Sequence, residues 1–327
     1  MRRRDFLKSA ALITISQPLE QAFAGSKNLN KVRVQSFNSN EIKTELFLSN
    51  YDQKLKIMQI TDLHFSDSNL DEAGFNKYSD RMNNAYKKVK HYRSNQETNT
   101  LNQFVGLLDY AVKNKVELLM LTGDIFNYPS KPSVSKLLEL LKETKIPFYY
   151  TTGNHDWHYE GMEGSLNNLR SQWINNALKP MYGTHNPLYY SVQNKGINMI
   201  VIDNSTYQIS EDQFHFFQKE MGKGMPSILF VHIPLYMKGL PTSTCGHPDW
   251  GEKTDKNFEI ERREKWSSSG NSIWTKRFLE EVYKTENLLA VFTGHHHENR
   301  VTHHDNLFQV FSLPAFQGYY RMIEIQG

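Results

Sequence analysis

The chain has 327 residues, of which 39% are hydrophobic and 22% charged, and its formal net charge is +3. The length allows one large or two small domains, and the composition is that of an ordered protein, not of a disordered chain. No run of about 18 apolar residues is present, which excludes an ordinary membrane-spanning helix. The single cysteine, Cys245, excludes a disulfide framework. The near-neutral charge argues against a stable nucleic-acid partner.

The N-terminal residues 1–24 resemble a bacterial export signal. The run Arg3-Arg4-Asp5-Phe6-Leu7-Lys8 is similar to the twin-arginine motif, and a short apolar stretch leads to a small-x-small cleavage site at residues 22–24. We therefore expect a signal peptide over 1–24 that is recognised by the twin-arginine translocase, and a linker over 25–30. A single domain over 31–327 would then be periplasmic or secreted. A frayed basic tail is the alternative.

Apolar periodicity predicts alternating strands and helices along the mature chain. In chain order, strands are predicted at 31–37, 42–48 and 55–60, a helix with an exposed insertion over 70–98, a helix at 101–113, a strand at 116–121, a helix at 134–141, and strands at 148–151, 188–192 and 198–202. A helix at 211–221 and strands at 227–231 and 288–292 follow. This alternation predicts an α/β fold.

Five of the predicted strands end in short polar segments. These are Asp62-x-His64, Gly123-Asp124, Asn154-His155, His232 and His295-x-His297. Each segment alone could be a turn or a loop, but sites in α/β sheets gather at the carboxyl ends of strands. Together the segments offer carboxylate, amide and imidazole ligands for borderline divalent metals, without thiolates. Seven such side chains are too many for one ion with open positions, so we predict a two-metal centre in which one carboxylate bridges.

These motifs, in this order, resemble the non-purple branch of the calcineurin-like metallophosphoesterase superfamily. Its D-x-H, GD, GNH[DE], H and GHxH blocks match this chain from about residue 55 to the C-terminus. Purple acid phosphatases carry a tyrosine three residues after the bridging aspartate, where this chain has Asn127. The resemblance implies a four-layer α/β/β/α sandwich of two mixed sheets flanked by helices.

The resemblance also implies a role for each motif residue. The implied ligands of two divalent ions (Mn²⁺, Fe²⁺ or Zn²⁺) are Asp62, His64, Asp124, Asn154, His232, His295 and His297. Asp124 would bridge the ions, His155 would give a proton to the leaving group, and Asp156 would tune or orient His155. The implied reaction is hydrolysis of a small phosphomonoester or phosphodiester by a metal-bridging hydroxide. A metal-binding pseudoenzyme or binding protein on the same fold is the alternative.

Residues outside the motifs are further candidates for the site. Substrate contact is considered for Trp157, His158, Tyr236, His247, Arg262 and Arg263, with core or rim packing as the alternative for the aromatic residues. The polar segment 237–271 is expected either to cover the metals and select the substrate or to be an exposed excursion. We expect His296 to face outward, because side chains alternate along an extended segment. The protein is expected to be a monomer or a small homo-oligomer.

The export signal can be tested with two conservative substitutions. Arg3→Lys combined with Arg4→Lys should retain the protein in the cytoplasm, because the translocase requires the paired arginines. Cell fractionation measures this, with Arg2→Lys as a control of equal charge. Undiminished periplasmic protein in the double variant would indicate the ordinary secretory route or no export signal.

Overall fold

The computed structural model describes residues 13–14, 31–67, 70–251, 270–305 and 307–327. Most of the predicted signal peptide, the predicted linker, the greater part of the predicted substrate loop, and both Arg262 and Arg263 lie outside these ranges.

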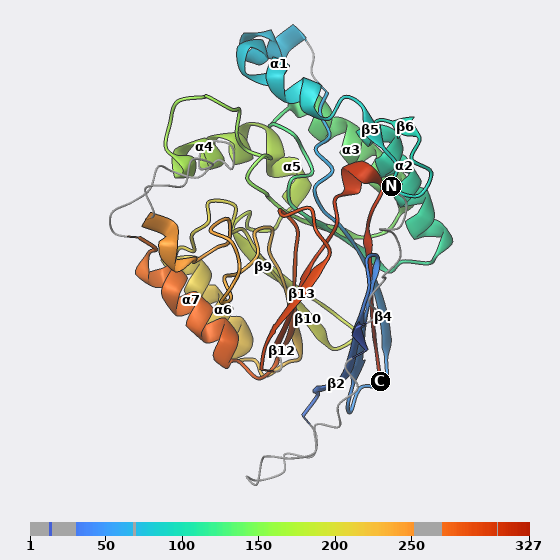
Figure 1. Ribbon diagram of the computed structural model, residues 1–327, viewed down its shortest axis with the longest axis vertical. Helices are drawn as coiled ribbons and strands as arrows, with labels where there is room; N and C mark the ends of the chain where they lie inside the picture. The colour runs from blue at the N-terminus through green and yellow to red at the C-terminus, as the bar shows by residue number, and fades with distance from the viewer. Residues whose placement is uncertain (1–12, 15–30, 68–69, 252–269, 306) are drawn as a thin grey trace, which may run out of the picture.

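In the described ranges, all strands except those of one small hairpin belong to two mixed sheets that face each other (Figure 1). The seven-stranded sheet has the order β1 (Ile13–Thr14), β2 (Val34–Ser39), β3 (Lys43–Leu48), β15 (Arg321–Gln326), β4 (Lys54–Ile60), β7 (Leu118–Thr122) and β8 (Phe148–Thr151). The six-stranded sheet has the order β13 (Arg300–His304), β14 (Leu307–Phe311), β12 (Leu288–Thr293), β11 (Ser227–Phe230), β10 (Ile197–Ile202) and β9 (Tyr189–Asn194). Parallel pairing of β4, β7 and β8, and of β10, β11 and β12, brings the carboxyl ends of these strands to one edge.

The described helices are α1 (Asn76–Ala85), α2 (Thr100–Lys113), α3 (Lys131–Thr144), α4 (Leu166–Trp173), α5 (Lys179–Tyr182), α6 (Glu211–Met221) and α7 (Ile273–Lys284). Helices flank the two sheets, whereas α1 lies at one end of the molecule, apart from the sheet faces (Figure 1). Shorter elements are the 3-10 turns η1 (Leu70–Phe75), η3 (Pro248–Gly251) and η4 (Ala315–Gln317), the π-helical turn η2 (Ile174–Leu178), and the small hairpin β5 (Val89–Lys90) and β6 (Glu97–Thr98). Local sequence sets several helix starts: Ser210 and Gln213 form a capping box at α6, and the Ser130 side chain caps α3.

The central strands of the six-stranded sheet are buried on both faces. Met199 and Val201 of β10 pack in the cluster that includes the first sheet, while Ile200 and Ile202 pack in a second cluster with α6 and α7. Figure 1 shows α6 and α7 lying against this sheet. Successive side chains of a strand point to opposite faces of the sheet, so alternate residues of β10 belong to two different apolar layers. The predicted four-layer α/β/β/α sandwich is confirmed.

Every strand and helix predicted from periodicity is present, with bounds that shift by up to three residues. The predicted helix within 70–98 is α1, and the β5–β6 hairpin lies in the same insertion. No bounds are predicted from the sequence for the helices between residues 166 and 182, for α7, or for the strands β13, β14 and β15. Their segments are short or interrupted by polar residues, so the local pattern carries little signal.

A buried polar network joins the two sheets beneath the carboxyl ends of their strands. Gln59 of β4 donates from Nε2 to Thr122 Oγ1 (2.8 Å) in the same sheet and to the Thr293 carbonyl (3.2 Å) in the other. Ser312 Oγ donates to Gln59 Oε1 (2.8 Å), and Arg321 Nε donates to Ser312 Oγ (2.8 Å). All five residues are buried. Since buried polar groups are costly when unpaired, this network fixes how the sheets meet.

Removing the central amide of this network should weaken the fold. Gln59→Leu leaves the Thr122 and Ser312 hydroxyls without their partner, so the free energy of unfolding should fall by about 2–3 kcal/mol. Urea unfolding followed by circular dichroism measures the change. The control is Gln193→Leu, at an exposed position of β9, which should change stability by less than about 0.5 kcal/mol. Equal effects of the two substitutions would contradict this role for Gln59.

Candidate metal centre

The polar tips of both sheets meet at one place. Ligand atoms lie within 4.8 Å of one another in three groups: Asp62, His64 and His297; His64, Asp124 and His155; and Asp124, His232 and His295. The groups share His64 and Asp124, so they form one continuous cluster. Asn154 is buried, and the next residue along the chain, His155, contacts the cluster. The His155 backbone N–H donates to Asp124 Oδ1 (2.8 Å). The structure thus brings the predicted ligands together from both sheets.

Asp124 occupies the middle of this cluster. Its Oδ2 lies 3.3 Å from His232 Nε2 and 3.9 Å from His64 Nε2. Asp62 Oδ1 lies 3.2 Å from His297 Nε2. A carboxylate between histidines of two different sheets has the position that a bridging ligand needs.

Most of the predicted ligands have a left-handed backbone, which non-glycine residues adopt rarely. The positive φ angles are 55° at Asp62, 50° at His64, 50° at Asp124, 70° at His295 and 53° at His297. Each such conformation costs about 1–3 kcal/mol and persists only where the surroundings enforce it. These dihedrals occur at the strand ends, and the sequence pattern does not indicate them.

Two motif glycines allow the strand tips to approach closely. A Cβ atom on Gly153 would lie 2.2 Å from Asp124 Oδ1, and one on Gly294 would lie 2.0 Å from Thr61 Oγ1. Any side chain at either position would push these groups apart. The glycines are therefore required by packing against the ligand segments.

The protonation of the cluster reflects its burial and its crowded charges. Burial lowers the pKa of His64 to about 4. Burial also acts to lower the pKa of His232, but the charge and hydrogen bond of Asp124 outweigh it and raise that pKa to about 9. Burial would raise the pKa of the Asp124 carboxyl, yet the charges of His232 and His64 hold it below its usual value. A divalent cation would compete with the proton that this pair holds.

Hydrogen bonds to the outer ring nitrogens orient two of the histidines. His232 Nδ1 donates to the Thr122 carbonyl (2.9 Å), which leaves Nε2 facing Asp124. The Tyr207 hydroxyl is hydrogen-bonded to His295 Nε2 (2.8 Å), which leaves Nδ1 as the ring atom that could bind a cation. Such partners are typical of metal-ligating histidines. Carboxylate, imidazole and amide donors held in this way fit borderline divalent cations.

The residues after Asp124 do not provide a tyrosinate ligand. Asn127 Nδ2 donates to the Met82 carbonyl (2.6 Å), and the Tyr128 hydroxyl donates to Asn83 Oδ1 (2.8 Å). Both side chains are thus engaged with α1.

The predicted catalytic pair separates into two different environments. The His155 ring packs edge-on against His64 with 4.6 Å between ring centroids, so it lies beside the cluster. Asp156 is fully buried, and its two oxygens accept the backbone N–H groups of Gly153 and Phe126, each at 2.6 Å. Burial and the nearby Asp124 charge raise the pKa of Asp156 well above its usual value. Asp156 therefore holds the backbone on both sides of the cluster, at Gly153 and at Phe126.

The described residues predicted to contact substrate pack against other parts of the fold. Trp157 is fully buried with Nε1 donating to Ser205 Oγ (2.8 Å), which matches the core-packing alternative. His158 is also buried. His247 Nε2 donates to the Leu240 carbonyl (3.2 Å) and its Nδ1 accepts from the Asp249 N–H (3.0 Å), while Tyr236 packs edge-on against its ring at 4.5 Å. His247 and Tyr236 thus hold the described start of the predicted substrate loop.

The expectation that His296 faces outward is wrong. Its side chain is 9% exposed, and Nε2 donates to the Ser243 carbonyl (2.9 Å). Alternation fails here because the positive φ angles of His295 and His297 interrupt the extended chain. His296 therefore connects the metal-ligand segment to the described start of the 237–271 loop.

Three aromatic residues beside the cluster were missed by sequence reasoning. Tyr207 contacts His295, and Tyr86 stacks on His64 with ring centroids 4.1 Å apart. Phe316 lies edge-on to His297 at 5.2 Å. All three come from segments outside the motifs, and nothing in the local pattern marks them.

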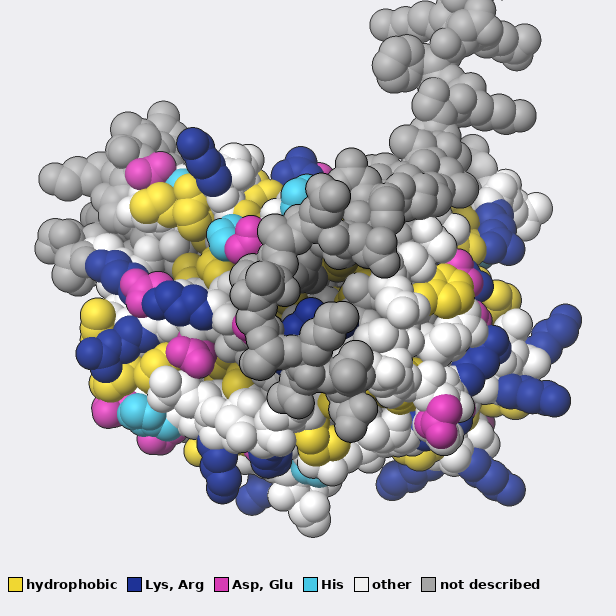
Figure 2. Space-filling model, turned by 90° about the horizontal axis from the view of Figure 1, so that it is seen from below, with side chains coloured by type: hydrophobic (Ala, Val, Ile, Leu, Met, Phe, Trp, Pro, Cys, Tyr) yellow, Lys and Arg dark blue, Asp and Glu magenta, His cyan; other side chains and the backbone are white. Residues whose placement is uncertain are grey.

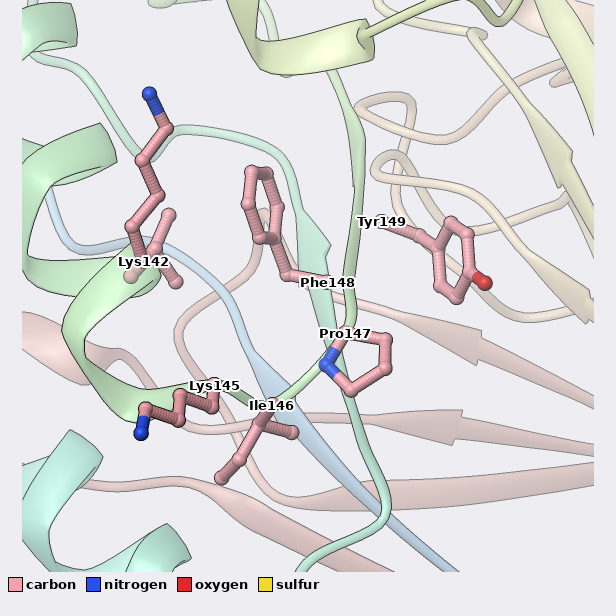
Figure 3. Close-up of a pocket in the computed structure, with 7 residues that line it drawn as sticks. Lys142, Lys145, Ile146, Pro147, Phe148 and Tyr149 are labelled. Atoms are coloured by element: carbon pink, nitrogen blue, oxygen red, sulfur yellow. The ribbon is translucent and has the colours of Figure 1, made fainter.

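A surface hollow of about 360 Å³ lies away from the cluster (Figure 3). It is lined by Leu141, Lys142 and residues 145–149, at the amino end of β8, whereas the motif with Asn154 follows the carboxyl end. Basic and acidic side chains are interspersed on the face shown in Figure 2. No helix in the described part of the chain has the length and apolar character to cross a membrane.

Comparison with known proteins gives one family and several distant relatives. The family described as calcineurin-like phosphoesterase matches residues 55–299. A protein of Fibrobacter succinogenes named "Probable cyclic nucleotide phosphodiesterase" is 22% identical to this chain, over 74% of this chain and 73% of the relative. A protein of Psychrobacter arcticus with the same name is 21% identical, over 81% of this chain and 81% of the relative. The structure of a dimetal phosphatase from Danio rerio covers 80% of this chain and 88% of its own, with 9% identity and a TM-score of 0.49.

The central position of Asp124 predicts its importance for cation binding. Asp124→Asn removes a charge shared by both halves of the cluster, so the affinity for Mn²⁺ should fall more than about 100-fold, beyond the loss typical of outer-shell partners. Isothermal titration calorimetry measures the affinity and the number of sites. Asp109→Asn, at an exposed position of α2, is the matched control. Two cations bound with unaltered affinity in Asp124→Asn would disprove the bridging role.

Proposed function

The chain belongs to the calcineurin-like phosphoesterase family and is a phosphoric ester hydrolase; from this premise we propose that it is a binuclear, metal-dependent enzyme of the non-purple type. The observation that carries the proposal is the position of Asp124 between histidines of two sheets, with a second carboxylate at Asp62. Asn127 and Tyr128, both bonded to α1 residues, support a centre without tyrosinate.

Phosphodiesters are the substrates that we place first, ahead of phosphomonoesters. The names of the two bacterial relatives support cyclic nucleotides as a starting point. When bound, two divalent cations would supply Lewis acidity to the phosphoryl oxygens and an activated water. The carboxylates and imidazoles of the cluster would hold these cations, which we propose to be Mn²⁺, Fe²⁺ or Zn²⁺.

Chain groups next to the cations complete the proposed reaction. The Asn154 amide, beside the cluster, would neutralise charge on a phosphoryl oxygen. His155, packed on His64, would protonate the departing alkoxide, because an imidazole titrates near neutral pH. Asp156 fixes the backbone that carries both side chains through its bonds to Gly153 and Phe126.

We also propose that the protein is exported by the twin-arginine translocase, on the strength of Arg3 and Arg4 in their motif. The role of the 237–271 loop in substrate selection stays a prediction. Its described start supports a link to the centre through the bond from His296 to Ser243.

Hydrolysis assays test the proposal directly. The purified protein with added Mn²⁺ should hydrolyse bis(p-nitrophenyl) phosphate and cyclic nucleotides, and Asp124→Asn should abolish this turnover. Cation binding without hydrolysis of any phosphoester would instead favour a binding protein on the same fold.

The role of His155 makes a separate prediction. His155→Ala should keep two bound cations while kcat falls about 10²–10⁴-fold for esters with poor leaving groups. The loss should be much smaller for p-nitrophenyl esters, because p-nitrophenolate leaves without protonation. A series of aryl esters with graded leaving-group pKa values measures the effect. A uniform loss across the series would rule out proton donation by His155.

A further inference from the structure

We propose that Tyr86 and Phe316 form an aromatic wall on one side of the metal centre, where a planar heteroaromatic group of the substrate stacks. The group of this chemistry that occurs in phosphodiesters is a nucleobase. This inference rests on the proposed function and names the class of substrate that it acts on.

The two rings cover the outer side of the Asp62, His64 and His297 group. The Tyr86 ring is parallel to the His64 ring, with 4.1 Å between centroids and 1° between planes. Phe316 lies 5.1 Å from Tyr86 at 60°, and 5.2 Å from His297 at 72°. Tyr86 and Phe316 are partly exposed, whereas His64 beneath them is buried. A substrate bound to the cations would therefore extend past aromatic surface on this side.

Backbone bonds fix one half of the wall relative to the ligands. The Phe316 N–H donates to the Asp62 carbonyl (3.0 Å), and the Ala315 N–H donates to the Thr61 carbonyl (2.8 Å). The element η4 is thereby tied to the segment that carries Asp62. Aromatic side chains held on such a scaffold can select a substrate without taking part in the reaction.

The other half of the wall comes from the insertion at residues 70–98. Tyr86 follows α1, and the Tyr92 N–H of the same insertion donates to the Gln317 carbonyl (2.9 Å) of η4. The insertion provides none of the predicted metal ligands. The insertion nevertheless contacts His64 through Tyr86. This contact is not needed for cation binding, so it is available for a role in substrate recognition.

Further aromatic and cationic groups of the insertion lie next to η4 and extend the aromatic surface beyond Phe316. Tyr92 stacks on Tyr319 with 3.9 Å between centroids, and the Arg93 guanidinium lies 5.2 Å from the centre of the Tyr92 ring. Aromatic faces and arginine bind the π-faces of bases of any sequence.

Two diesters with one leaving group separate base recognition from the reaction. Thymidine 5′-(p-nitrophenyl phosphate) and methyl p-nitrophenyl phosphate both release p-nitrophenolate, but only the first carries a base. The wild-type protein should prefer the thymidine ester by kcat/KM. Tyr86→Leu and Phe316→Leu should each reduce this preference about tenfold, mainly through KM, since stacking on one ring is worth roughly that factor or more. Tyr86→Phe should retain the preference, and Tyr149→Leu, at the distant hollow, should not alter it.

A binding measurement keeps the wall testable independently of turnover. In calorimetry with Mn²⁺, Tyr86→Leu should weaken binding of thymidine 5′-monophosphate about tenfold relative to inorganic phosphate. If the wild-type protein hydrolyses neither ester, the proposed function is contradicted. The binding measurement still tests the aromatic wall in that case. If wild type shows no preference for the thymidine ester or nucleotide, or if Tyr86→Leu weakens both members of each pair equally, the wall is refuted and the rings only shield His64.

Discussion

The structure depends on the electrostatics of one cluster, in which carboxylates and imidazoles from two sheets crowd around Asp124. His64 reaches Asp124 from the first sheet, and His232 reaches it from the second. Buried charges at such distances need counter-charges, and left-handed backbone at the ligand residues adds further cost. Divalent cations would offset both. In such a site, the free energy of cation binding offsets the free energy that the crowded ligands cost on folding.

The rest of the fold holds the two strand-end edges in register for this cluster. Apolar layers on both faces of β10 and β11 make the sheets rigid, and the Gln59 network joins them directly below the ligands. The network reaches the ligands themselves, because the Thr122 carbonyl accepts the hydrogen bond that orients His232. Stability and ligand geometry are therefore supplied by the same buried bonds.

Much of this could be predicted from the sequence, because the relevant signals are local. Periods of two and 3.6 mark the strands and helices, and the strand-end rule locates the polar tips, such as the segment with Asp62 and His64. What could not be predicted depends on contacts between distant segments or on unusual dihedrals. Tyr86 meets His64 only through the folding of an insertion, and His296 turns inward because its neighbours have positive φ.

Anomalous scattering from a crystal grown with Mn²⁺ tests most directly the proposal that Asp124 lies between two cations. We expect two anomalous peaks about 3.5–4 Å apart, with a carboxylate oxygen of Asp124 within coordinating distance of both. His64 and His297 should lie at one peak, and His232 and His295 at the other. A single peak, or two peaks that do not share Asp124, would contradict the account.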